Sequence, residues 1–174
     1  NKSLMAQYPE SFDPGTDQQW VYTGTRGLQD AVGGVPLDAG KLVLSPTRTY
    51  APLIARILPE WRHRISGMIH CSGGAQTKVL HFVKDVHVIK DQLFETPPLF
   101  KMIQSSSGTD WKEMYKVFNM GHRMEIYTDQ EAAESIITES KAMGVDAQII
   151  GHCEPHTGRL VTVTGEHGTF EYNH

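Results

Sequence analysis

Helical and strand-like apolar patterns alternate along this chain from residue 41 onward, and this alternation limits the folds that it can adopt. Apolar residues recur with the period of a helix over 50–58, 75–83, 110–118 and 129–143. Short apolar or alternating runs predict strands at 42–44, 65–70, 86–89, 124–127, 147–150, 160–164 and 169–172. Interspersed helices and strands, with a hairpin turn near the end of the chain, predict an α+β fold in which a mixed sheet is covered by helices.

The pattern at 50–58 predicts a helix with one apolar face. Its apolar residues follow the spacing i, i+3, i+4, i+7, i+8, and they are Tyr50, Leu53, Ile54, Ile57 and Leu58. Thr49 is suited to cap the start of this helix, and Pro52 lies in the first turn, where its missing N–H is harmless. Pro59 predicts that the helix ends there.

Capping residues mark the boundaries of the later helices. Asp110 and Glu113 have the spacing of a capping box, and Thr128 with Glu131 has the same spacing before the next helix. Gly144 predicts the end of that helix, because glycine readily adopts the left-handed backbone of a helix C-terminus.

One more helix is predicted to begin after Thr96, because proline at 97 and 98 suits the first turn of a helix. Leu99, Phe100 and Ile103 lie on one face of this helix, and the run 105–108 ends it.

Residues 1–39 have weak periodicity and many prolines and glycines, which interrupt regular structure. We interpret 1–39 as a poorly ordered or wrapping segment, with a short helix near 2–8 and a strand near 19–23. Residues 40–174 then form one domain, since 174 residues that are 39% hydrophobic suffice for a single core.

Charge and composition exclude several classes of protein. A net charge of −4 provides no broad positive surface for nucleic acid or anionic lipid. No apolar run is long enough to span a membrane, and no signal peptide is recognisable, so we expect a cytoplasmic protein without membrane or nucleic-acid partners. Cys71 and Cys153 are expected to be free thiols of a reducing compartment. The sequence starts without methionine and lacks a nucleotide-binding fingerprint, so we expect a piece of a longer chain.

The most informative local feature is the run His70-Cys71-Ser72-Gly73-Gly74, between a predicted strand and a predicted helix. Glycines allow backbone amides to approach an anion, and the start of a helix attracts negative charge, which together favour a phosphate site. A tight strand-to-helix turn explains the same residues equally well.

Two other features suggest ligand contacts. In Phe118-Asn119-Met120-Gly121 a carboxamide and a glycine separate two apolar elements; Asn119 and Gly121 suit a ligand, but the ordinary chemistry of a helix-ending turn explains them too. Thr47 and Arg48 precede a predicted helix, where the guanidinium is suited to bind a phosphate or carboxylate, although a surface ion pair is the alternative.

Nine histidines raise the question of a metal site. The run 152–156 contains His152, Cys153, Glu154 and His156, but we interpret it as an exposed loop, and no second cluster completes a set of four ligands. The sequence therefore predicts no metal site in this chain.

Five segments taken in order resemble one family, the aminoimidazole ribonucleotide (AIR) synthetases, also called phosphoribosylformylglycinamidine cyclo-ligases. They are Ser45-Pro46-Thr47-Arg48-Thr49-Tyr50, Gly67-Met68-Ile69-His70 with Gly73-Gly74, Pro97-Pro98-Leu99-Phe100, Glu113-Met114-Tyr115, and Phe118-Asn119-Met120-Gly121. The resemblance covers about 40–152 and is to the C-terminal domain of the family. It implies the layered α/β/α fold of that domain.

The resemblance also implies an activity. In this family ATP activates the formyl amide oxygen of formylglycinamidine ribonucleotide, a nitrogen of the substrate attacks, and AIR, ADP and phosphate form. ATP and Mg²⁺ are held mainly by a preceding N-terminal domain, which this chain lacks, so the isolated chain is expected to be inactive. A homodimer is implied for the full-length enzyme.

Residue by residue, the resemblance implies a catalytic role or a ligand contact for His70. It implies phosphate or substrate contacts for Gly73, Gly74, Asn119 and Gly121. Proton transfer is a second possible role of His70, because an imidazole titrates near neutral pH.

The chain departs from the family pattern at five positions: Cys71, Ser72, Ala75, His122 and Arg123. Related ATP-using enzymes remain alternatives: selenophosphate synthetase, thiamine monophosphate kinase, hydrogenase maturation factor and formylglycinamidine ribonucleotide synthetase. A non-catalytic binding module of the same fold is an alternative of another class.

Overall fold

The computed structural model describes residues 2–45 and 48–173. The α-helices are α1 (Lys2–Gln7), α2 (Ala39–Val43), α3 (Ala51–Trp61), α4 (Pro98–Ser107), α5 (Trp111–Val117) and α6 (Gln130–Ala142). The 3-10 helices are η1 (Pro9–Ser11), η2 (Gln18–Trp20) and η3 (Ala75–His81). The strands are β1 (Ile65–His70), β2 (Val86–Lys90), β3 (Met124–Thr128), β4 (Gly151–Pro155), β5 (Arg159–Gly165) and β6 (Gly168–Tyr172).

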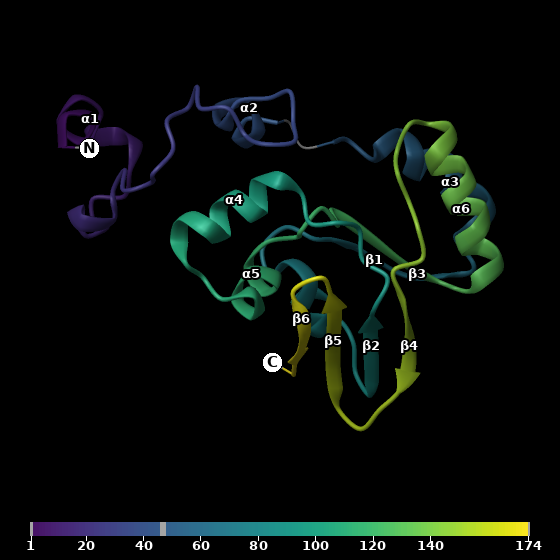
Figure 1. Ribbon diagram of the computed structural model, residues 1–174. Helices are drawn as coiled ribbons and strands as arrows, with labels where there is room; N and C mark the ends of the chain where they lie inside the picture. The colour runs from purple at the N-terminus through teal and green to yellow at the C-terminus, as the bar shows by residue number, and fades with distance from the viewer. Residues whose placement is uncertain (1, 46–47, 174) are drawn as a thin grey trace.

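The strands form two sheets (Figure 1). The larger has the order β4-β2-β5-β6, in which β2 and β5 are parallel and the other pairs are antiparallel. The smaller is the antiparallel pair β1–β3. An α+β fold with a mixed sheet and helices is therefore confirmed, while β1 and β3 are set apart from the mixed sheet.

One apolar core joins the two sheets. Its buried residues come from β1, η3, β2, α5, β5, β6 and the segments that follow β1 and α5: Ile69, Cys71, Val79, Leu80, Val88, Tyr115, Met120, Val161, Val163 and Tyr172. A smaller cluster of Leu53, Ile57 and Ile136 packs α3 against α6, which lie side by side in Figure 1. The apolar faces of α3 and α6 were both predicted from helical spacing.

Several predicted boundaries are confirmed. Asp110 caps α5 by accepting the Glu113 N–H at 3.0 Å, and α4 begins at the proline pair and ends at Gly108 with left-handed backbone. The segment predicted as a helix at 75–83 is η3, a 3-10 helix, with Val79 and Leu80 buried as predicted.

Two predicted helix boundaries were wrong. Helix α3 continues through Pro59 to Trp61, because a proline near the C-terminal end removes only its own hydrogen bond, and the Arg62 N–H still bonds Leu58 O at 3.0 Å. The cap of α6 is Asp129, which accepts the Ala132 N–H at 3.1 Å, and not Thr128.

Two predicted strands in the first third of the chain are helical turns. Asp38 accepts the Lys41 N–H at 2.8 Å and starts α2 where a strand was expected at 42–44. Asp17 accepts the Gln19 N–H at 3.0 Å and starts η2 where a strand was expected near 19. Short apolar runs do not distinguish the two structures, whereas the acidic caps do. The short helix expected near 2–8 is α1.

The strand predicted at 147–150 and the exposed loop predicted at 152–156 were also wrong. The strand in this region is β4, which spans Gly151–Pro155. Gly151 lies so close to β2 that a Cβ there would be 1.8 Å from the carbonyl oxygen of Ile89. The pairing partner decides the position of this edge strand, and pairing is not visible in local propensity.

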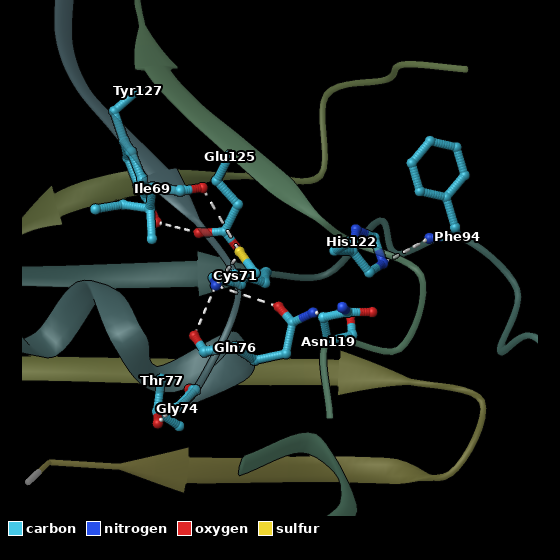
Figure 2. A network of polar contacts seen from close by, with 11 residues as sticks. Ile69, Cys71, Gly74, Gln76, Thr77, Phe94, Asn119, His122, Glu125 and Tyr127 are labelled. Atoms are coloured by element: carbon cyan, nitrogen blue, oxygen red, sulfur yellow. Dashed lines mark hydrogen bonds and ion pairs between the residues drawn. The ribbon is translucent and has the colours of Figure 1, made fainter. Parts of the chain in front are cut away.

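A buried ion pair connects the two sheets beneath η3. The Lys90 ammonium lies 2.5 Å from Glu125 Oε1, and it also donates to Gln76 O at 2.7 Å and to Gln76 Oε1 at 3.2 Å. Tyr127 donates to the other oxygen of Glu125 at 2.6 Å (Figure 2). Lys90, Gln76 and Glu125 are at most 5% exposed, so each charge depends on these partners for stabilisation.

Among the described residues, no helix combines the length and apolar character needed to cross a membrane. The division of the chain at residue 39, and the disorder expected before it, stay predictions.

Loss of one partner of the buried pair is expected to be costly. We expect Lys90→Met to lower the free energy of unfolding by about 3–5 kcal/mol, because it leaves the Glu125 carboxylate buried without a cation. Lys116→Met, which removes an exposed pair with Glu113, is the control and is expected to cost at most about 1 kcal/mol.

Chemical denaturation of the purified chain measures both effects. Adding Glu125→Leu to Lys90→Met removes the unpaired charge, so we expect the double variant to recover most of the lost stability. Equal stability of the two single lysine variants would contradict the role given to this pair.

Candidate functional site

A pocket of about 350 Å³ lies where the turn after β1, the start of α4 and the turn before β3 meet. It is lined by Leu42, Ser45, His70, Cys71, Ser72, Pro97, Pro98, Leu99, Phe100, Asn119, Gly121 and Arg123. Three of the predicted site residues, His70, Asn119 and Gly121, are thus brought to one pocket from positions about 50 residues apart in the sequence.

The histidine is the last residue of β1. His70 pairs with Met124 across the small sheet, which directs the chain toward the pocket, and its side chain is exposed. The imidazole makes no hydrogen bond or ion pair with the residues that the structure describes. It is therefore free to contact a ligand.

The glycine turn lies next to the pocket and not in its lining. Gly73 and Gly74 have φ values of +52° and +78°, a backbone conformation that glycine adopts without strain. Gly74 O accepts the Thr77 N–H at 2.8 Å and so starts η3. The amides of both glycines donate to no other described residue, which leaves the predicted anion contact open.

The Asn119 turn serves the fold as well as the pocket. Asn119 Oδ1 accepts the Gly121 N–H at 3.0 Å, and its backbone oxygen accepts the Gln76 side-chain amide at 2.8 Å. Gly121 has a φ of +95°, and a Cβ there would lie 3.1 Å from Pro97 Cγ. Asn119 and Gly121 therefore form a turn and also line the pocket, although the sequence suggested the turn and a ligand contact as alternatives.

Arg48 lies away from this pocket. Its Nη1 donates to the backbone oxygen of Gly144, two residues after the end of α6, at 2.6 Å. The prediction for Thr47 falls outside the described residues.

The polar groups of the pocket favour a negative ligand. Arg123, a permanently charged residue, lines the pocket, and the Lys78 ammonium holds the neighbouring Ser72 by donating to its backbone oxygen at 2.6 Å. No Asp or Glu is among the described residues that line the pocket. Pro97, Pro98 and Phe100 form an apolar wall beside these donors.

Cys71 lines the pocket without being a nucleophile. Burial, followed by the nearby Glu125 carboxylate, raises the pKa of the Cys71 thiol to about 12. The thiol therefore remains protonated at neutral pH, and only a thiolate attacks efficiently.

No group of three or more His, Cys, Asp and Glu side chains within 2–45 and 48–173 is arranged to hold a metal ion. The His152 and Glu154 side chains instead form an exposed pair, 3.2 Å apart, on β4.

A larger groove of about 830 Å³ lies between the small sheet, α6 and the β2–β4 edge. Its lining is mainly apolar, and it contains none of the predicted site residues except Gly121. The smaller pocket is the better candidate because three predicted site residues, His70, Asn119 and Gly121, converge on it.

Comparison with known proteins identifies the family. Residues 25–163 match the family model described as AIR synthase related protein, C-terminal domain. The chain belongs to this family. The resemblance read from the five motifs is confirmed.

Individual relatives of the AIR synthase family support this result. The phosphoribosylformylglycinamidine cyclo-ligase of Methanopyrus kandleri is 32% identical over 123 residues, which are 71% of this chain and 35% of that protein. The enzyme of the same name from Methanococcus vannielii is 34% identical over 122 residues, covering 68% of this chain and 34% of that protein. The chain thus spans about a third of the length of these relatives.

A solved structure of HypE, a hydrogenase maturation protein from E. coli, has the same fold. Its TM-score is 0.53, with 19% identity, and the match covers 78% of this chain and 45% of that chain. The AIR synthase-like fold is therefore confirmed by structure as well as by sequence.

The sequence did not predict a place in the pocket for Arg123, which it marked only as a departure from the family pattern, and it gave Ser72 only as part of the run 70–74 and as another departure. It also missed Gln76, Lys90 and Glu125. One signal was available for Lys90. It lies two residues after the buried Val88 in β2, and residues two apart in a strand face the same side of the sheet.

His122, next to Arg123, makes the stability of this site dependent on pH. Burial lowers the pKa of His122 to about 4, and Nε2 of its neutral ring accepts the Phe94 N–H at 3.2 Å (Figure 2). The unfolded chain takes up a proton near pH 6.5, whereas the folded chain does so only near pH 4. Stability is therefore lost as the pH falls between these values.

We expect this loss to reach about 3 kcal/mol at the acid end of the window. His122→Gln keeps an acceptor but does not titrate, so its free energy of unfolding is expected to depend less on pH between 6.5 and 4 than that of the unsubstituted chain. His63→Gln, an exposed control, is expected to follow the unsubstituted chain. Parallel pH profiles for all three proteins would contradict the effect.

Proposed function

We propose that this chain supplies the C-terminal domain of a phosphoribosylformylglycinamidine cyclo-ligase. In the proposed reaction ATP phosphorylates the formyl amide oxygen of formylglycinamidine ribonucleotide, a substrate nitrogen attacks the activated carbon, and phosphate leaves as AIR forms. The observation that carries the proposal is the meeting of His70, Asn119 and Gly121 in one pocket of a chain that belongs to the AIR synthase family.

The proposed roles of the residues follow from their places. His70 contacts the substrate or moves a proton, since its imidazole is exposed and free of other described partners. Asn119 and Gly121 bind the substrate from the facing turn, and Gly73 with Gly74 offers two amides to a phosphate beside the pocket. Arg48, held at Gly144, would reach a phosphate only in another arrangement of its side chain, and the phosphate contact of Thr47 stays a proposal.

ATP and Mg²⁺ are needed for this reaction. The pocket has no described carboxylate, and no described cluster suits a metal ion, so these residues do not fit Mg²⁺. We propose that both are held mainly by the N-terminal domain of the full-length enzyme. What this chain supplies is the positioning of substrate and the stabilisation of phosphate charge.

The curated relatives favour this activity over the other ATP-using members of the superfamily. Their names specify the cyclo-ligase, whereas the likeness to HypE extends to the fold alone. We further propose that the full-length enzyme is a cytoplasmic homodimer, that residues 40–174 form its C-terminal domain, and that 1–39 is a wrapping segment.

The isolated chain is expected to fold but not to catalyse. Purified chain mixed with formylglycinamidine ribonucleotide, Mg²⁺ and ATP is expected to yield no AIR above background, because the described residues offer no metal site. Adding the separately expressed N-terminal domain of the enzyme is expected to restore turnover. Turnover by the chain alone would contradict the proposal that the N-terminal domain holds ATP and Mg²⁺. A mixture of folded domains that forms no AIR would favour a binding module.

His70 is the most direct test of the proposed site. In the reconstituted enzyme we expect His70→Ala to lower kcat by a factor of about 100 or more, as for loss of a general acid or base. The melting temperature is expected to change little, because the side chain is exposed. His63→Ala, also exposed and outside the pocket, is the control for both measurements. An equal loss of stability and activity would assign His70 to the fold instead.

A further inference from the structure

Arg123 is the one residue with a permanent positive charge among the described residues that line the pocket, and it also lines the larger groove. Its backbone is fixed, because Arg123 O accepts the Cys71 N–H at 2.9 Å and so joins the ends of β1 and β3. Its side chain makes no hydrogen bond or ion pair with any residue in the described part of the chain. A partly buried arginine without an internal partner has its donors available for a ligand.

Two further donors on the same pocket are unused. The imidazole of His70 has no described partner, and Asn119 uses its Oδ1 for the Gly121 N–H but has no described partner for its Nδ2. Half-buried polar groups normally find hydrogen bonds, so the free donors of Arg123 and Asn119 at one pocket indicate a missing acceptor, and the exposed His70 lies beside them.

The charge around the pocket defines that acceptor. The chain as a whole carries a net charge of −4, yet no described Asp or Glu lines this pocket, and the Lys78 ammonium lies beside it on Ser72. Glu125, the one buried carboxylate among the described residues, is already paired with Lys90. A planar guanidinium forms paired hydrogen bonds with a phosphate or carboxylate, and phosphate is the anion present in the proposed substrates.

We propose that Arg123 binds a phosphate group in this pocket and so determines its specificity for phosphorylated ligands. This proposal rests on the proposed function and adds to it the group recognised and the residue that recognises it. The volume of about 350 Å³ fits a small phosphorylated molecule, or one end of a larger one, with the apolar wall at Pro97 and Phe100 beside the rest of the ligand. The phosphate is either the monoester of the ribonucleotide or a phosphate of ATP.

Binding to the purified full chain tests the proposal without any catalysis. NMR titrations are made with ribose 5-phosphate, ribose and ATP on the unsubstituted chain, Arg123→Ala and Arg123→Lys. We expect ribose 5-phosphate to bind and ribose not to bind, and we expect Arg123→Ala to weaken binding about tenfold or more. Arg123→Lys keeps the charge but loses the paired geometry, so its affinity is expected to be intermediate.

Arg62→Ala, which removes an exposed arginine outside the pocket, is the matched control and is expected to bind as the unsubstituted chain does. Amide spectra of each variant establish that it is folded. Arg123-dependent binding of ribose 5-phosphate assigns the site to the substrate monoester, and Arg123-dependent binding of ATP alone assigns it to the nucleotide; either supports a phosphate site. Absence of binding, equal binding of ribose, or unchanged affinity in Arg123→Ala would overturn the proposal.

The outcome is separable from that of the proposed function. Phosphate binding through Arg123 in a chain that never supports AIR formation would leave this inference standing and remove the cyclo-ligase. Conversely, a reconstituted enzyme in which Arg123→Ala leaves the KM for formylglycinamidine ribonucleotide and the KM for ATP both unchanged would retain the cyclo-ligase and remove this inference.

Discussion

The ion pair between Lys90 and Glu125 is the interaction on which the arrangement of this domain depends. It joins β2 of the mixed sheet to β3 of the small sheet, at a depth where neither charge has access to water. A buried pair costs desolvation energy, which good geometry and additional hydrogen bonds must offset. Tyr127 and Gln76 supply those bonds, and so the pair specifies how the two sheets and η3 meet.

The same network extends to the pocket. Gln76 receives the Lys90 ammonium on its oxygens and donates its side-chain amide to the backbone of Asn119, so the core and the turn before β3 are coupled through one residue (Figure 2). Cys71, whose thiol lies near the Glu125 carboxylate, precedes the glycine turn. Both walls of the pocket are therefore held by the core, which leaves His70 and Arg123 able to serve a ligand.

Local chemistry made much of the fold predictable. The amphipathic faces of α3, α4, α5 and α6 and strands β1, β2, β3, β5 and β6 follow patterns that a few neighbouring residues define. The errors occurred where local signals are weak or ambiguous. Pro59 is tolerated near a helix end, Asp38 changes an apolar run into a helix, and β4 is defined by its partner β2.

The candidate site was predictable only in part. The motifs around His70, Gly73, Asn119 and Gly121 are local in sequence, and their ordered set led to the AIR synthase family. Their meeting in space depends on contacts between residues that are far apart in the sequence. Arg48 was expected beside a ligand, but its guanidinium donates to Gly144 O. Arg123 was noted only as a departure from the family pattern, yet it lines the pocket.

The sequence by itself determined the helical faces, the cap at Asp110, the family, and the two turns that carry the candidate site. These properties depend on residues within one or two helical turns of one another, where spacing and residue type act directly. Only the tertiary structure decided that strands β1 and β3 form their own sheet, that Lys90 meets Glu125, and that Arg123 joins His70 at one pocket. The physical reason is that long-range pairing depends on the packing of the whole core, and local spacing along the chain does not encode which charge will meet which.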